Sequence, residues 1–254
     1  MTAAPEREPA AASSPLRLAV LGALALLAFL GLVALGTWQV ERRAWKLDLI
    51  ARVDARIHAP AAPAPGPAAW PAIGAATDEY RHVTARGSYL QGQDTLVQAT
   101  TALGGGFWVL APFRTDGGFT VLVNRGFVPG ERRDPGSRDP GLAQHRVTGL
   151  LRVTEPGGGF LRSNDPAADR WHSRDVAAIA AKRGLGEVAP YFIDAEAVPG
   201  AAPLPVGGLT VVSFPNSHLV YALTWYGLAL MLAGAICYVM REEWRARRRA
   251  AARR

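Results

Sequence analysis

The chain has 254 residues, of which 49% are hydrophobic and 19% are charged, and its formal net charge is +7. This length and composition accommodate one sizeable folded domain together with membrane segments. The positive charge is concentrated at the C-terminus, where residues 241–254 hold seven Arg against two Glu. A basic excess confined to a short tail argues against nucleic acid as a partner, because the folded part carries no broad basic surface.

The first apolar stretch, residues 18–38, contains no charged side chain. About 20 apolar residues suffice to cross a hydrocarbon core of about 30 Å, so this stretch is predicted to be a transmembrane helix, with residues 1–17 as its N-terminal tail. A cleaved signal peptide is the alternative, because Arg17 precedes the run and residues 34–36 offer a small-residue cleavage site. The apolar core of such a peptide normally spans only about 7 to 15 residues.

Residues 39–71 connect this span to the next folded part of the chain. Trp45, Leu49 and Val53 recur at four-residue spacing, which predicts that the helix continues over residues 41–57 as a stalk. The Pro/Ala-rich residues 59–71 cannot continue a helix and are predicted to be a linker.

Residues 72–217 are typical of a β-rich domain. Short runs rich in β-branched and aromatic residues, separated by Gly, Asp and Pro, predict strands. These runs are residues 80–90, 95–99, 107–113, 119–128, 146–153, 191–195 and 209–214. One helix is expected between N-cap Ser173 and Gly184, and a bend or bulge at Asn124-Arg125-Gly126. The predicted fold class is a membrane α+β protein in which two transmembrane helices flank a mostly antiparallel, barrel-like extracytoplasmic domain with one helix.

The second uncharged stretch, residues 218–240, is predicted to span the membrane and to be followed by the basic tail 241–254. No Lys or Arg lies between Arg183 and Arg241, so the positive-inside rule places the tail in the cytoplasm. Basic residues just after the first span favour the opposite orientation, but this charge asymmetry is weaker. Since two spans put both termini on one side, the stronger asymmetry predicts cytoplasmic termini and an exported central domain.

The sequence offers little enzyme machinery. It lacks the GxSxG, HExxH, P-loop and GxGxxG motifs, and its single cysteine, Cys237, lies in the second apolar run, so the central domain has no disulfide or CxxC site. The other histidines, His58, His82, His145 and His172, have no ligand-like spacing. We predict that the protein is not an enzyme; an envelope enzyme with a dispersed site is the rival interpretation.

His218 differs from the other histidines because it opens the second span. Pro215 favours a helix start nearby, and the positive end of the helix dipole disfavours a charged imidazolium there. A neutral ring keeps a nitrogen lone pair for a metal, and Trp225 lies seven residues on, about 20° off the direction of His218. A planar macrocycle could lie on this face, where small Ala222 leaves a gap. The alternative is an interfacial histidine with Tyr221 and Trp225 as membrane-belt anchors.

Six blocks in order make the chain resemble the surfeit locus protein 1 family of cytochrome c oxidase biogenesis factors, and the sequence is identified as a bacterial member. The blocks are residues 35–46 (LGTWQVERRAWK), 80–90 (YRHVTARGSYL), 121–129 (VLVNRGFVP), 164–176 (NDPAADRWHSRDV), 189–196 (APYFIDAE) and 215–230 (PNSHLVYALTWYGLAL). Departures are Phe127, where many members carry Trp, and His172, where an aromatic residue is frequent.

The resemblance implies that the protein binds haem a and assists its insertion into the catalytic subunit of cytochrome c oxidase. His218 matches the histidine of the family's N-x-H-x-x-Y-x-x-T-W pattern and is the implied axial ligand of the haem iron; Tyr221 and Trp225 belong to the same pattern, and Asn216 is expected to orient the imidazole. The implied partners are that subunit, the haem a synthase and the lipid bilayer.

Two expectations accompany the resemblance. Usage rich in Ala, Arg, Gly and Pro indicates a bacterium, so the expected location is the plasma membrane, with the central domain in the periplasm. The alternative function is a cofactor-free membrane scaffold that stabilises oxidase assembly intermediates.

Overall fold

The computed structural model of the chain describes residues 14–138, 145–159, 161–198, 200, 204–210 and 212–252. The expected N-terminal tail lies outside the described residues up to position 13, as do the last two residues of the basic tail. The chain divides into two compact units, one formed by Met1–Leu49 with Phe214–Arg254 and the other by Ile50–Ser213.

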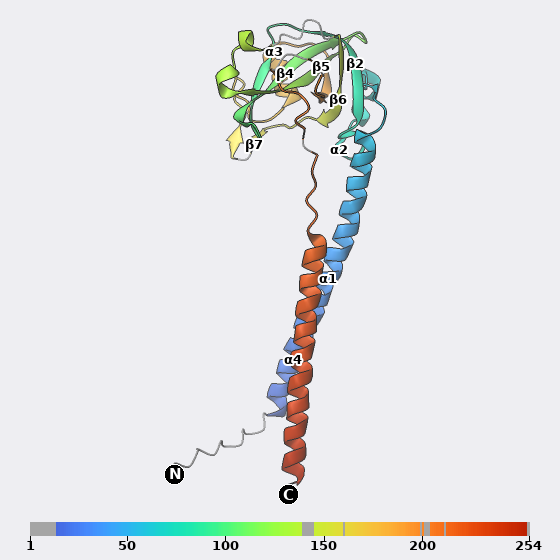
Figure 1. The fold of residues 1–254 in the computed structure, drawn as a ribbon, viewed down its shortest axis with the longest axis vertical. Helices are drawn as coiled ribbons and strands as arrows, with labels where there is room; N and C mark the ends of the chain where they lie inside the picture. The colour runs from blue at the N-terminus through green and yellow to red at the C-terminus, as the bar shows by residue number, and fades with distance from the viewer. Residues whose placement is uncertain are drawn as a thin grey trace. The chain divides into compact units, whose positions relative to one another are not determined.

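The first unit consists of two long helices that lie side by side, α1 (Pro15–Ile57) as far as Leu49 and α4 (His218–Ala252) (Figure 1). Both are long and apolar enough to cross a membrane. Many of their leucines are exposed, among them Leu27 and Leu230, as expected of side chains that face lipid. The helices run antiparallel, because Gln39 contacts His218 while the earlier Thr37 contacts the later Tyr226.

Close packing holds this helix pair in register along one seam. A Cβ added to Gly36 would meet the ring of Tyr226 at 2.7 Å, so only glycine allows the ring to lie there. Thr37 Oγ1 and the Tyr226 hydroxyl are 3.1 Å apart and form a hydrogen bond. On α4, Ala222 and Ala229 are both buried and seven residues apart, which is the repeat of a helix–helix seam.

The second unit contains a closed five-stranded barrel (Figure 1). Around the barrel its strands are paired in the order β2, β6, β9, β5 and β4, and β4 also pairs with β2, which closes the barrel. The β5–β9 pair is parallel and the other pairs are antiparallel, so the barrel is mixed. The predicted class, two terminal apolar helices around a barrel-like domain with one short helix, is confirmed.

The other elements extend or decorate the barrel: β3 pairs with β4, β1 pairs with β2, and β7 and β8 form a separate hairpin. The strands are β1 (Ala62–Pro63), β2 (His82–Tyr89), β3 (Thr95–Thr101), β4 (Gly104–Thr115), β5 (Thr120–Pro129), β6 (Arg146–Val153), β7 (Gly158–Gly159), β8 (Arg162–Ser163) and β9 (Val188–Ala195). The short helices are η1 (Pro67–Ala72), α2 (Ala75–Asp78), η2 (Gly130–Arg132), η3 (Pro135–Ser137) and α3 (Val176–Arg183).

Alternating side chains divide the hydrophobic core into two clusters. One fills the barrel and takes every second residue of its strands, for example Val121 and Val123 of β5. The other lies on the opposite face of the sheet, where Leu122 and Phe192 meet Ile179 of α3. The Pro/Ala segment also packs on the barrel cluster, through Ala64, Trp70 and Ile73.

Two local predictions near this core have clear outcomes. The bulge is present: Trp108 pairs with Phe127 and Leu110 with Asn124, so two residues of β5 oppose one of β4. The helix is also present and ends at Gly184, whose φ is 60°. Its N-cap is Asp175, which accepts from the backbone of Ala178, and not the predicted Ser173. The Ser173 hydroxyl instead donates to the carbonyl of Glu155.

The prediction of a strand over residues 209–214 is wrong for the described residues of this range. These residues have no regular secondary structure, and residue 211 lies outside the described part. The pairing occurs earlier, where Val206 forms a bridge with Phe127. Two glycines follow Val206. The hydroxyl of Thr210 then donates a hydrogen bond to the buried carboxylate of Asp194, so this side chain does not belong to a face of the sheet.

Candidate functional site

His218 is the first residue of α4, which places its ring at the end of the helix pair. The preceding Pro215 has no amide hydrogen to donate, and the carbonyl of Ser217 accepts from the amide of Tyr221 in the first helical turn. The histidine therefore lies in the first turn of this helix, as the sequence predicts, and its imidazole is half-buried.

The imidazole contacts α1 through Gln39. His218 Nδ1 lies 2.7 Å from Gln39 Oε1, and Gln39 is only 9% exposed. An amide oxygen can only accept a hydrogen bond, so Nδ1 carries the proton and donates it. In the neutral ring the lone pair then belongs to Nε2, which is the arrangement that a histidine needs to bind a metal.

Gln39 was missed by the sequence reasoning, which gave the orienting role to Asn216. The structure records no such contact; Asn216 Oδ1 is buried and has no hydrogen-bond partner among the described residues. A signal for Gln39 was present in the sequence. It directly follows the apolar run 18–38, so it lies near the end of one span just as His218 lies at the end of the other.

The aromatic residues of the predicted site are not gathered on one open face. Trp225 is half-buried, whereas Tyr221 is 53% exposed. The gap expected at Ala222 is filled, because this residue is only 2% exposed. The side of α4 that was expected to receive a flat ligand is thus the side that packs against α1.

A second polar cluster lies in the barrel unit around Asp194, which is 3% exposed. Its carboxylate accepts hydrogen bonds from four side chains, and all of its acceptor capacity is used. The donors are Asn124 at 2.7 Å, Arg152 at 2.9 Å, Thr210 at 3.0 Å and Arg174 at 3.2 Å. A cluster saturated in this way ties strands to the segment before α4 and leaves no atom for a ligand.

The charges around Asp194 shift the pKa values of their neighbours. Burial lowers the pKa of Arg152, but the negative charges of Asp194 and Glu79 outweigh it and raise that pKa above its ordinary value. Burial raises the pKa of Glu155, but hydrogen bonds and charge from Arg174, followed by the charge of Arg152, bring it below its ordinary value. These groups therefore stay charged near neutral pH and act as a structural network.

Metal-binding clusters are not found in the described part of the chain, where no three His, Cys, Asp or Glu side chains gather. A site with one protein ligand, as on a haem iron, would not produce such a cluster. Nε2 of His218, the ring nitrogen that does not contact Gln39, is therefore the strongest candidate for a ligand position among the described residues.

Comparison with known proteins matches residues 26–230 to the model of the SURF1 family. Surfeit locus protein 1 of Homo sapiens is 38% identical over 217 residues, which cover 77% of this chain and 69% of the human protein. The protein of the same name from Rattus norvegicus is 36% identical over 215 residues, covering 76% and 67%. A SURF1-like protein of Monosiga brevicollis is 34% identical over 227 residues, covering 82% and 83%.

Proposed function

Since this chain belongs to the SURF1 family, whose members are cytochrome c oxidase assembly factors, we propose that it carries haem a on His218 and assists its transfer to the oxidase. Members of the family are not enzymes, and haem a would be cargo that is bound and released. The catalytic subunit is the proposed recipient, and the haem a synthase is the proposed donor.

The observation that carries this proposal is the hydrogen bond between His218 and Gln39 at 2.7 Å. Ligand histidines commonly donate their second ring N–H to an oxygen, which fixes the tautomer and the ring orientation. Gln39 is held in the seam and gives His218 this support from the neighbouring helix. A single protein ligand suits cargo that must leave again, because the second axial position stays available to the recipient.

The packing of the helix pair limits where such a cargo can bind. Ala222 is covered, and Gly36 lies against the ring of Tyr226, so the seam below His218 has no room for a macrocycle. We therefore place the cargo on the outer side of His218, near the exposed Tyr221.

The proposed location is supported by the two candidate membrane helices, the distribution of charge and the Ala-, Arg-, Gly- and Pro-rich composition. We propose a bacterial plasma membrane protein with both termini in the cytoplasm and the barrel in the periplasm. His218 would then lie at the periplasmic end of its helix. In the proposed function the barrel contacts the partner proteins.

The test is the visible absorption spectrum of the full-length protein purified from cells that make haem a. A Soret band is expected, and pyridine haemochrome analysis should identify haem a. His218→Ala should remove most of the bound haem, whereas His58→Ala, which alters an exposed histidine just after the end of α1, should retain it.

Three outcomes would contradict the proposal in different ways. A colourless wild-type protein would show that no haem is bound, and unchanged haem content in His218→Ala would show that another residue is the ligand. Oxidase subunits that co-purify with a colourless protein would favour the cofactor-free scaffold. Thermal unfolding of both variants distinguishes a lost ligand from a lost fold.

A further inference from the structure

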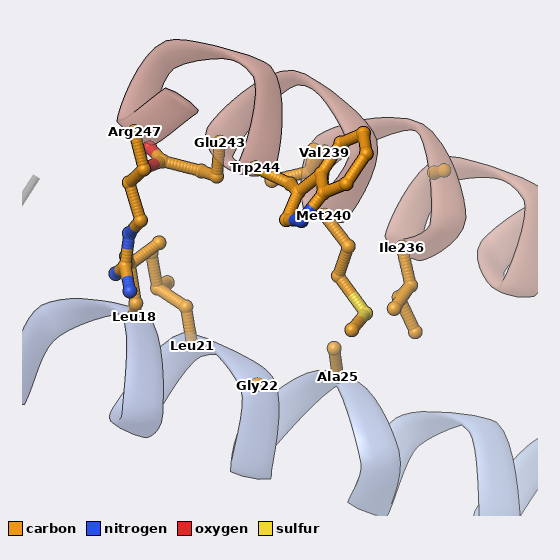
Figure 2. A pocket seen from close by; sticks show the side chains of 11 residues that line it. Leu18, Leu21, Gly22, Ala25, Ile236, Val239, Met240, Glu243, Trp244 and Arg247 are labelled. Carbon is orange, nitrogen blue, oxygen red and sulfur yellow. The ribbon is translucent and has the colours of Figure 1, made fainter. Parts of the chain in front are cut away.

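The helix pair contains an apolar groove at the end opposite to His218. It has a volume of about 620 Å³, and both helices line it (Figure 2). On α1 the lining includes the small residues Gly22 and Ala25, and Met240 of α4 points toward Ala25. The volume lies within the range of about 300–1,000 Å³ that is typical of ligand pockets.

The groove exists because the seam is not closed at this end. Near His218 the helices touch through Gly36 and Tyr226, whereas a Cβ added to Gly22 would meet nothing within 4 Å. The larger apolar side chains along the groove stay largely exposed, 62% for Leu21 and 66% for Met240. Residues 235–247 of α4 extend over about 18 Å, which suits an elongated apolar ligand.

Polar side chains lie only at one end of the groove. There Arg247 extends from α4 toward Leu18 of α1, and Trp244 and Glu243 line the same end (Figure 2). Glu243 offsets the charge of Arg247 locally, but the described turns of α4 after Met240 hold five Arg against two Glu. Arg248 lies over the Trp244 ring, with its guanidinium carbon 3.7 Å from the ring centroid. The end is therefore positively charged and carries a tryptophan, as membrane interfaces commonly do.

We propose that this groove binds an anionic phospholipid, with an acyl chain along Gly22 and Ala25 and the phosphate at Arg247. The change from an apolar groove to a cationic end matches the two parts of such a lipid. A transmembrane helix of a partner would also cover apolar residues, but it would gain nothing from the arginines beside the groove. This inference does not depend on haem binding, because the groove and His218 lie at opposite ends of α4.

The test uses the full-length protein in nanodiscs made from phosphatidylglycerol or phosphatidylcholine with the same acyl chains. Lipids retained after transfer to detergent are counted by native mass spectrometry. The wild type should retain phosphatidylglycerol over phosphatidylcholine by about fivefold, the preference expected from one arginine near the lipid phosphate. Arg247→Gln should abolish the preference, and Arg249→Gln, the same change outside the groove lining, should keep it.

A second pair of variants tests the groove itself. Gly22→Leu fills it and should reduce the retention of phosphatidylglycerol, whereas Gly31→Leu should not, although an added Cβ has open space at both positions. Equal retention of the two lipids by the wild type would overturn the proposal. So would equal retention in Gly22→Leu and Gly31→Leu, or a co-purified protein helix that is displaced by Gly22→Leu while lipid retention stays unchanged.

Discussion

Asp194 in the barrel unit and His218 in the helix pair are both polar side chains held among apolar neighbours, yet their hydrogen bonding differs. Asp194 accepts from four side chains, whereas among the described residues the His218 imidazole is held only through Nδ1. A polar group whose partners are all supplied by the protein stabilises the fold. One that is oriented on one side and free on the other is prepared for a ligand.

The largest effect is expected from Asp194→Ala, which would break the saturated cluster. The change leaves Arg152 and Arg174 with less compensation for their charge, and removing one partner of a buried ion pair typically costs about 3–5 kcal/mol. Chemical unfolding of the full-length protein in detergent would measure the loss. Asp165→Ala removes an exposed ion pair with Arg170 and should have little effect. Similar midpoints for the two variants would show that the cluster does not hold the barrel together.

The next effect concerns the oriented side of His218. Gln39→Ala removes the acceptor for Nδ1, and loss of such support typically weakens metal binding by about 10–100-fold. Haem titration of the apoprotein, followed by the Soret band, would measure the change. Thr37→Val removes another hydrogen bond between the helices and should leave haem affinity unchanged. If both variants bind haem as the wild type does, Gln39 has no part in orienting the ligand.

A smaller effect is expected from the seam that brings Gln39 to His218. Gly36→Ala places a methyl group against the Tyr226 ring, and overpacking of this kind costs about 1 kcal/mol or more. Gly31→Ala meets no atom within 4 Å and should be neutral or slightly stabilising. The thermal midpoints of the two variants in detergent would show the difference. Equal midpoints would mean that the helices are not in close contact at Gly36.

The smallest effect is a pH dependence from Glu155. Its pKa is lowered from 4.5 in the folded state, so its contribution to stability is present above this value and is lost as the pH falls through the lowered pKa. Because the carboxylate is about one-third exposed, the contribution should stay below about 1 kcal/mol. Thermal midpoints of wild type and Glu155→Gln should converge in acid and diverge toward neutral pH. A constant difference would exclude this titration.

The barrel shows where sequence reasoning succeeded and where it did not. Strands such as β6 and β9 were predicted because a short run of β-branched and aromatic residues bounded by Gly, Asp or Pro is a local signal. The strand predicted over residues 209–214 is not formed by the described residues. Thr210 instead donates a hydrogen bond to the carboxylate of Asp194, and only the tertiary structure brings these two side chains together. Both Ser173 and Asp175 are good caps, and the choice between them depended on Glu155, whose carbonyl takes the serine hydroxyl.

The sequence by itself determined the two apolar helices, the β-rich domain between them and the position of His218 at a helix start. Hydropathy, runs of β-branched and aromatic residues and the effect of proline all act over a few residues. Only the tertiary structure decided that Gln39, 179 positions away, supports the imidazole, that Ala222 is covered and that the other end of the seam stays open. These features depend on which helix faces meet and how closely. That choice is set by packing between distant segments, which no local pattern records.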